Sequence, residues 1–151
     1  MSLAEQLDND LKAALRSGDE RTKSMLRLVR AGVKNAEVAK GPGTVLDDAG
    51  ILNVIAKEIR EHKDSLAEFL KANRNDLAEV AVAELVILQR YMPVQLSRDE
   101  IEVAAKAIIA SVGATGLGDK NKVMPVIMTQ LRGKADGRDI NEVVSALLAG
   151  G

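Results

Sequence analysis

The stretch Pro93-Val94-Gln95-Leu96-Ser97-Arg98-Asp99-Glu100 divides the chain into two helical parts. Proline lacks a backbone N–H, so Pro93 ends the helical pattern that precedes it. Ser97 with Glu100 three residues later forms a capping box, which is the signature of a new helix. The sequence therefore predicts an N-terminal helical lobe over residues 1–94 and a C-terminal helical lobe over residues 95–151.

Four helices are predicted in the N-terminal lobe. A capping box at Ser2 and Glu5 opens the first, Gly41-Pro42-Gly43 stops the second, and Asp76 is expected to cap the fourth. The expected ranges are about residues 2–18, 20–40, 48–72 and 76–92. The apolar stripes of the last three are Met25, Leu26, Val29, Val33 and Ala36; Ile51, Ile55, Ile59, Leu66, Phe69 and Leu70; and Leu77, Val80, Ala81, Leu85 and Leu88.

Three shorter helices are predicted in the C-terminal lobe. They begin at Ser97, at about Asp119 and just after Asp136, and residues 113–118 are expected to be a flexible connection. Their apolar stripes include Ile101, Ala104, Ala105, Ile108 and Ile109 in the first and Ile140, Val143, Val144 and Leu147 in the third. No segment shows the sustained alternation of a strand, so the predicted fold class is all-α.

Composition excludes several functions. The 151 residues contain no cysteine, which removes disulfides, thiolate metal sites and a cysteine nucleophile. The formal net charge is −1, so any nucleic-acid binding must come from a local basic patch. No secretory signal and no apolar run of about 20 residues is seen. We therefore expect a cytoplasmic protein with no membrane partner.

The sequence has few residues that could form a catalytic, metal-binding or phosphate-binding site. His62 is the one histidine and falls on an apolar helical stripe, so we interpret it as a partly buried contact between helices. We expect no metal, no cofactor and no catalytic residue. The loop Gly113 to Lys120 lacks the Gly-Lys-Ser/Thr ending of a phosphate-binding P-loop.

The second predicted helix carries a basic face formed by Lys23, Arg27, Arg30 and Lys34. Residues 12–40 contain eight basic and three acidic residues. This pattern is typical of a solvated helix face, and it also suits a surface for phosphates or for an acidic partner.

A second basic region surrounds the corner Arg132-Gly133-Lys134-Ala135-Asp136-Gly137-Arg138. Gly133 is predicted to be the C-cap of the preceding helix and Asp136 the N-cap of the following one. A turn alone therefore explains these residues, and it leaves the cations unexplained. The predicted nucleic-acid-binding residues are Lys120, Lys122, Arg132, Lys134 and Arg138.

Several motifs resemble those of one family along nearly the whole chain. They are Tyr91-Met92-Pro93-Val94-Gln95-Leu96-Ser97, Lys63-Asp64-Ser65 with Asn73-Arg74, Lys122-Val123-Met124, and Gly133-Lys134-Ala135-Asp136-Gly137. The chain resembles the YqeY-like proteins of the GatB/YqeY group. Pro125 departs from the pattern, which commonly allows glycine there, so the helix around it is expected to start later or to bend.

The resemblance implies two all-α lobes and a relation to the tail of the B subunit of glutamyl/aspartyl-tRNA amidotransferase. That tail holds tRNA, and the family is associated with carbon–nitrogen ligase activity that uses glutamine as amide donor. This chain has no amidase signature and no ATP loop. We therefore expect a non-catalytic accessory module that binds the tRNA backbone. The alternative is a helical adaptor that docks on an amidotransferase or an aminoacyl-tRNA synthetase.

Overall fold

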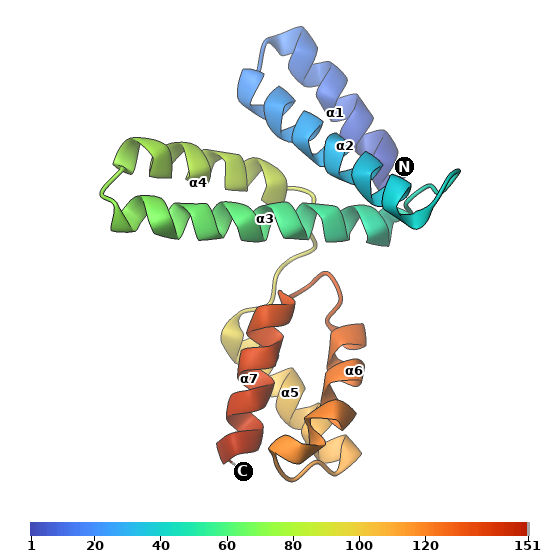
Figure 1. Ribbon diagram of the computed structural model, residues 1–151, viewed down its shortest axis with the longest axis vertical. Coiled ribbons are helices and arrows are strands. Elements are labelled where there is room, and N and C mark those ends of the chain that lie inside the picture. Colours follow the sequence, from blue (N-terminus) through green and yellow to red (C-terminus); the bar gives the residue numbers. More distant parts are fainter. Residues whose placement is uncertain (151) are drawn as a thin grey trace. The chain divides into compact units, whose positions relative to one another are not determined.

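The computed structural model describes residues 1–150; Gly151, the last residue of the predicted C-terminal lobe, lies outside them. Residues 1–150 form α-helices and one short 3-10 helix, with no strand among them, which confirms the predicted all-α class (Figure 1). The elements are α1 Leu3–Ser17, α2 Glu20–Lys40, α3 Asp48–Lys71, α4 Asn75–Gln89, α5 Arg98–Val112, η1 Leu117–Asp119, α6 Lys120–Gln130 and α7 Gly137–Gly150.

The helices pack as two compact units, Met1–Met92 and the part of the chain from Pro93 onward. Each unit has its own aliphatic core. The first core contains Leu3, Met25, Val29, Leu46, Ile51, Ile55, Ile59, Leu85, Ile87 and Leu88. The second core contains Ile101, Ala105, Ile108, Val123, Ile127, Leu131, Ile140, Val143, Val144 and Leu148.

The first unit consists of two helical hairpins, α1–α2 and α3–α4 (Figure 1). The turn between α1 and α2 uses Gly18 in the left-handed conformation, and Asp19 caps α2 by accepting a hydrogen bond from the Thr22 N–H. The Asp48 carboxylate accepts a hydrogen bond from the Leu3 N–H at 3.0 Å, which ties the start of α1 to the start of α3. The two hairpins approach each other closely at Gly32, where an added Cβ would lie 2.8 Å from a Val54 methyl carbon.

Three details of the N-terminal prediction are wrong. Asp76 does not cap α4, because the helix already begins at Asn75 and the Asp76 carboxylate instead pairs with the Arg74 guanidinium at 3.0 Å. Leu70 and Val80 were placed on buried stripes, but they are 55% and 41% exposed. For Val80 the reason is that α4 is apolar on several sides, so the spacing of its apolar residues alone does not identify the buried face.

The second unit begins with the predicted capping box. The Ser97 hydroxyl accepts from the Glu100 N–H, and the Glu100 carboxylate accepts from the Ser97 N–H. In the connection after α5, which the sequence predicts to be flexible, the Asp119 carboxylate accepts hydrogen bonds from the Thr115 N–H and hydroxyl. Helix α6 begins at Lys120 and includes Pro125, so the later start considered for this helix does not occur.

No single helix within residues 1–150 is long and apolar enough to span a membrane, although α5 and Leu117–Gln130, bent by 86°, together meet that criterion of length and composition.

Candidate nucleic-acid interface

The corner between α6 and α7 is a short turn in which the Lys134 N–H donates to the Leu131 carbonyl at 2.9 Å. Leu131, and not Gly133 as predicted, is the C-cap of α6, because the helix ends at Gln130. Gly133 lies two residues further on with a φ of 77°, a conformation in which glycine has no steric penalty. Asp136 caps α7 as predicted, since its carboxylate accepts a hydrogen bond from the Arg138 N–H at 2.9 Å.

Gln95 and Leu96, near the start of the second unit, brace this corner with hydrogen bonds. The Leu96 N–H donates to the Lys134 carbonyl at 2.8 Å. The side-chain amide of Gln95 donates to the Gly133 carbonyl at 2.8 Å and to the Pro93 carbonyl at 2.7 Å. Sequence reasoning missed this role of Gln95 and Leu96. The backbone at Gly133 and Lys134 is therefore held by two hydrogen bonds, which lowers the entropy cost of presenting the Lys134 side chain to a ligand.

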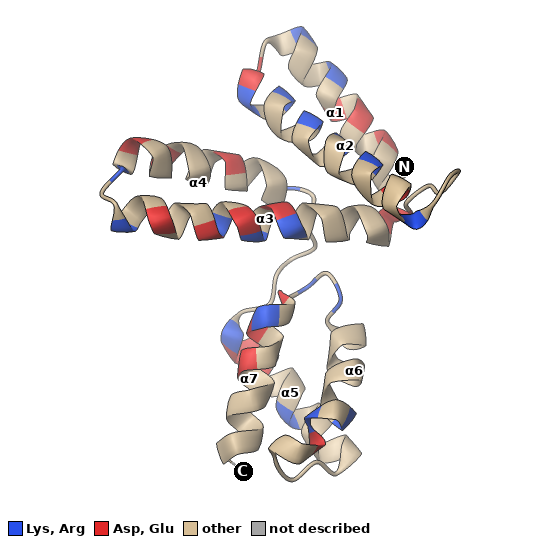
Figure 2. Ribbon diagram, viewed as in Figure 1, with Lys and Arg blue, Asp and Glu red and all other residues tan. Residues whose placement is uncertain are grey.

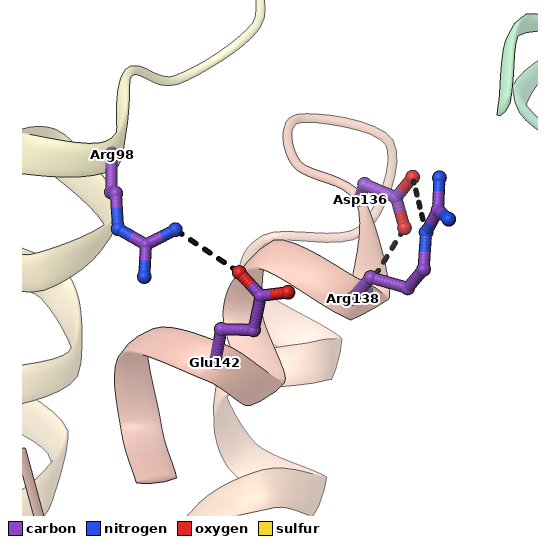
Figure 3. A network of polar contacts seen from close by, with 4 residues as sticks. All are labelled: Arg98, Asp136, Arg138 and Glu142. Carbon is purple, nitrogen blue, oxygen red and sulfur yellow. Dashed lines mark hydrogen bonds and ion pairs between the residues drawn. The ribbon is translucent and has the colours of Figure 1, made fainter. Parts of the chain in front are cut away.

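Three of the five predicted binding residues lie at this corner. Arg132, Lys134 and Arg138 are all exposed. Arg138 lies beside Asp136, with its Nε atom 3.9 Å from the carboxylate (Figure 3). Close by, Arg98 at the start of α5 pairs with Glu142 of α7 at 3.1 Å (Figure 3). Arg138 lies in the first turn of α7, where a cation opposes the helix dipole, and the neighbouring Asp136 carboxylate offsets this unfavourable charge.

The other two predicted residues do not join this cluster. Lys120 and Lys122 lie in the first turn of α6, at the opposite end of the helix from the corner (Figure 2). An eleven-residue helix is about 16 Å long, which separates the two groups. Lys122 also lies 3.5 Å from Asp119. The pKa of Asp119 is lowered, first by the Thr115 hydrogen bonds and then by Lys122.

The second unit has no overall basic character. Residues 93–150 contain seven basic and seven acidic residues, so the formal charges cancel. Binding of an anion to this unit must therefore depend on how the charges are placed. The corner concentrates Arg132 and Lys134 on one exposed turn, whereas Lys106 on α5 is paired with Glu102 at 3.1 Å.

The first unit carries the basic face predicted on the second helix. Lys23 pairs with Glu20 at 2.6 Å. Arg27, Arg30 and Lys34 are exposed, and no ion pair joins them to any residue in the described part of the chain. This face of α2 therefore presents three exposed cations to the solvent.

His62 lies where the sequence indicated, partly buried at the contact of α3 and α4. Its Nδ1 atom is 2.9 Å from the Glu58 carbonyl oxygen, and its Nε2 atom is 3.8 Å from a Glu84 carboxylate oxygen. Its side chain is 15% exposed. No group of three or more histidine, aspartate or glutamate side chains within residues 1–150 is placed to hold a metal ion.

We expect Glu58→Gln to stabilise the first unit at pH 8. Desolvation, and then the charge of Glu61, raise the pKa of Glu58, so its ionised form is disfavoured by folding. The penalty is present above the raised pKa of the folded state and absent below the normal pKa of the unfolded state. The gain should therefore be on the order of 0.5 kcal/mol at pH 8 and should vanish near pH 4.

The measurement is urea unfolding followed by the fluorescence of Tyr91, the single tyrosine in a chain without tryptophan. Because Tyr91 belongs to the first unit, this signal follows that unit alone. A variant that is less stable than the wild type at pH 8 would contradict the assignment.

Comparison with known proteins places the chain in a family. The family model described as Yqey-like protein matches residues 4–148. The chain belongs to the YqeY-like family. This confirms the resemblance found in the motifs around Pro93 and Gly133.

Three fungal relatives carry the name altered inheritance of mitochondria protein 41, mitochondrial. The protein from Lachancea thermotolerans is 36% identical over 66% of this chain and 53% of its own length. Those from Kluyveromyces lactis and Pyrenophora tritici-repentis are 32% and 30% identical, over 89% and 93% of this chain and 69% and 80% of their own lengths. The chain thus spans about half the length of the Lachancea protein. The expected cytoplasmic location is contradicted, because these relatives are named as mitochondrial proteins.

Proposed function

We propose that this YqeY-like protein is a tRNA-binding accessory module that has no catalytic activity of its own. The binding site is the α6–α7 corner, and its phosphate-contacting residues are Arg132, Lys134 and Arg138. The observation that carries the proposal is the brace formed by Gln95 and Leu96, which fixes a turn bearing exposed cations. The relation to the amidotransferase tail is part of this proposal.

The chemistry of the corner favours recognition of the RNA backbone. Arginine and lysine bind phosphate oxygens through charge-assisted hydrogen bonds. The chain has only one phenylalanine and one tyrosine, Phe69 and Tyr91, and both lie in the first unit. The corner therefore offers no aromatic platform on which single-stranded bases could stack. Binding should depend on the shape and charge of the tRNA rather than on its sequence.

Salt dependence tests the proposal. Three phosphate contacts predict that the logarithm of the tRNA association constant falls against the logarithm of salt concentration with a slope of about −2 to −3. The experiment is a titration of labelled tRNA with the full chain at several salt concentrations. No binding at low salt, or an affinity that does not change with salt, would refute the proposal. A slope steeper than about −4 would show that the site extends beyond the corner.

A second candidate function is favoured by the unpaired cations of α2. Arg27, Arg30 and Lys34 form a surface on the first unit that a protein partner, such as an amidotransferase or an aminoacyl-tRNA synthetase, could contact. A complex that survives nuclease treatment, and that Arg27→Glu disrupts, would support this adaptor. A complex that nuclease destroys would instead support the tRNA module.

A further inference from the structure

A groove of about 390 Å³ lies on the first unit between α1 and α2. Leu7 and Leu11 of α1 and Leu26 and Val33 of α2 line it, and Ile51 of α3 contributes to its lining. Leu11, Leu26 and Ile51 are at most 7% exposed, so they form a packed floor beneath the opening. The groove is apolar along its base and is formed by three helices that the core holds in place.

The two sides of the groove differ in charge. Arg30 and Lys34 of α2 line one side, one helical turn apart. Both are exposed, and neither forms an ion pair with another residue in the part of the chain that the structure describes. Asp8 of α1 lines the opposite side. The acidic Glu37 also lines the groove, but its carboxylate already accepts a hydrogen bond from the Leu46 N–H at 2.9 Å.

We propose that this groove binds an amphipathic helix of a partner protein, whose apolar stripe is flanked on one side by aspartate or glutamate. The apolar stripe packs on Leu7, Leu11 and Val33, and the acidic flank faces Arg30 and Lys34. This surface lies in a different unit from the corner proposed to bind tRNA, and it does not depend on that function.

The spacing of the lining residues favours a helix as the occupant. Along α2 they run from Leu26 to Glu37, which corresponds to about 16 Å, or three helical turns. On each of α1 and α2 they follow the i, i+3, i+4, i+7 spacing of a single helix face, so both walls are continuous. A helix that lays its apolar face between two such walls buries one side chain per turn. The difference in charge between the two sides of the groove then determines how the bound helix is rotated about its own axis.

Binding of two designed peptides tests the proposal directly. Both are fluorescent helical 15-residue peptides with leucine at every third or fourth position; one carries glutamate along one flank, and the other carries lysine at the same positions. We expect the glutamate peptide to bind the full chain at least about tenfold more tightly than the lysine peptide, measured by fluorescence anisotropy. Raising the salt concentration should reduce this difference.

A charge-reversed variant provides the decisive comparison. The variant with Arg30→Glu and Lys34→Glu should bind the glutamate peptide about tenfold more weakly than the wild type does. It should bind the lysine peptide more tightly. Lys57→Glu with Lys63→Glu makes the same charge change at exposed positions of α3 and should leave both affinities unchanged. The variant Lys134→Glu with Arg138→Glu should also bind the glutamate peptide normally, which separates this site from the tRNA site.

Three results would overturn the proposal. The first is no binding of either peptide up to about 1 mM. The second is equal affinity for the two peptides, which would indicate apolar contact without charge recognition. The third is that neither peptide binds, whereas a fluorescent fatty acid binds the wild-type chain and not the variant with Arg30→Glu and Lys34→Glu. The groove would then be a site for a small apolar anion.

Discussion

Lys134→Glu combined with Arg138→Glu is expected to weaken tRNA binding at low salt by about tenfold or more. The double variant removes two of the three cations at the α6–α7 corner. It also adds two negative charges, which repel the phosphates. The fold should remain intact, because both side chains are exposed. The hydrogen bonds from Gln95 and Leu96 end on backbone carbonyls of the corner, so they do not involve the substituted side chains. The salt slope should also become shallower by about one unit per contact removed.

A matched control lies at the other end of α6. Lys120→Glu with Lys122→Glu makes the same change in net charge within the same unit, at the start of the helix. If the corner is the site, this variant binds tRNA nearly as well as the wild type when compared by the same filter-binding titration. A control that loses as much affinity as the corner variant would show that the second unit binds only through its net charge.

Leu88→Ala is expected to destabilise the first unit by about 2–5 kcal/mol. Leu88 lies in α4 at 0% exposure, within the core that also contains Ile55 and Val29. Truncation removes apolar contacts and leaves a cavity that three packed helices cannot fill completely. Because a domain has only about 5–15 kcal/mol of stability in total, the midpoint of urea unfolding followed by Tyr91 fluorescence should fall sharply.

The control for this prediction is Val86→Ala on the same helix. Val86 is 51% exposed, so its truncation should change the free energy of unfolding by no more than about 0.5 kcal/mol. Equal losses for Leu88→Ala and Val86→Ala would mean that α4 does not pack on the first core through the face described here.

Much of the helical framework could be predicted, because its signals act over a few residues. The ends of α2 at Glu20 and Lys40 agree with the prediction, since Asp19 and Gly41 mark them in the sequence itself. The capping box of Ser97 and Glu100 is likewise a contact between residues three apart. Asp76 failed as a predicted cap because Arg74, only two residues away, offers its carboxylate a charged partner.

The candidate sites depend on contacts that sequence spacing does not reveal. The brace between Leu96 and Lys134 joins residues 38 positions apart, and nothing in either local pattern indicates it. The five predicted cations are close in sequence, yet the length of α6 separates Lys120 from Arg132. The groove on the first unit requires α1, α2 and α3 to pack together, so it too became visible only in the folded structure.

The most direct test of the central claim is a tRNA titration of the isotope-labelled full chain, followed by backbone amide NMR shifts. We predict that the largest changes fall on residues 132–138, with smaller changes at Gln95 and Leu96, which are hydrogen-bonded to that turn. The amides at the start of α6 should be unaffected. Changes confined to residues 1–92, or no change at all at low salt, would contradict the claim that the corner binds tRNA.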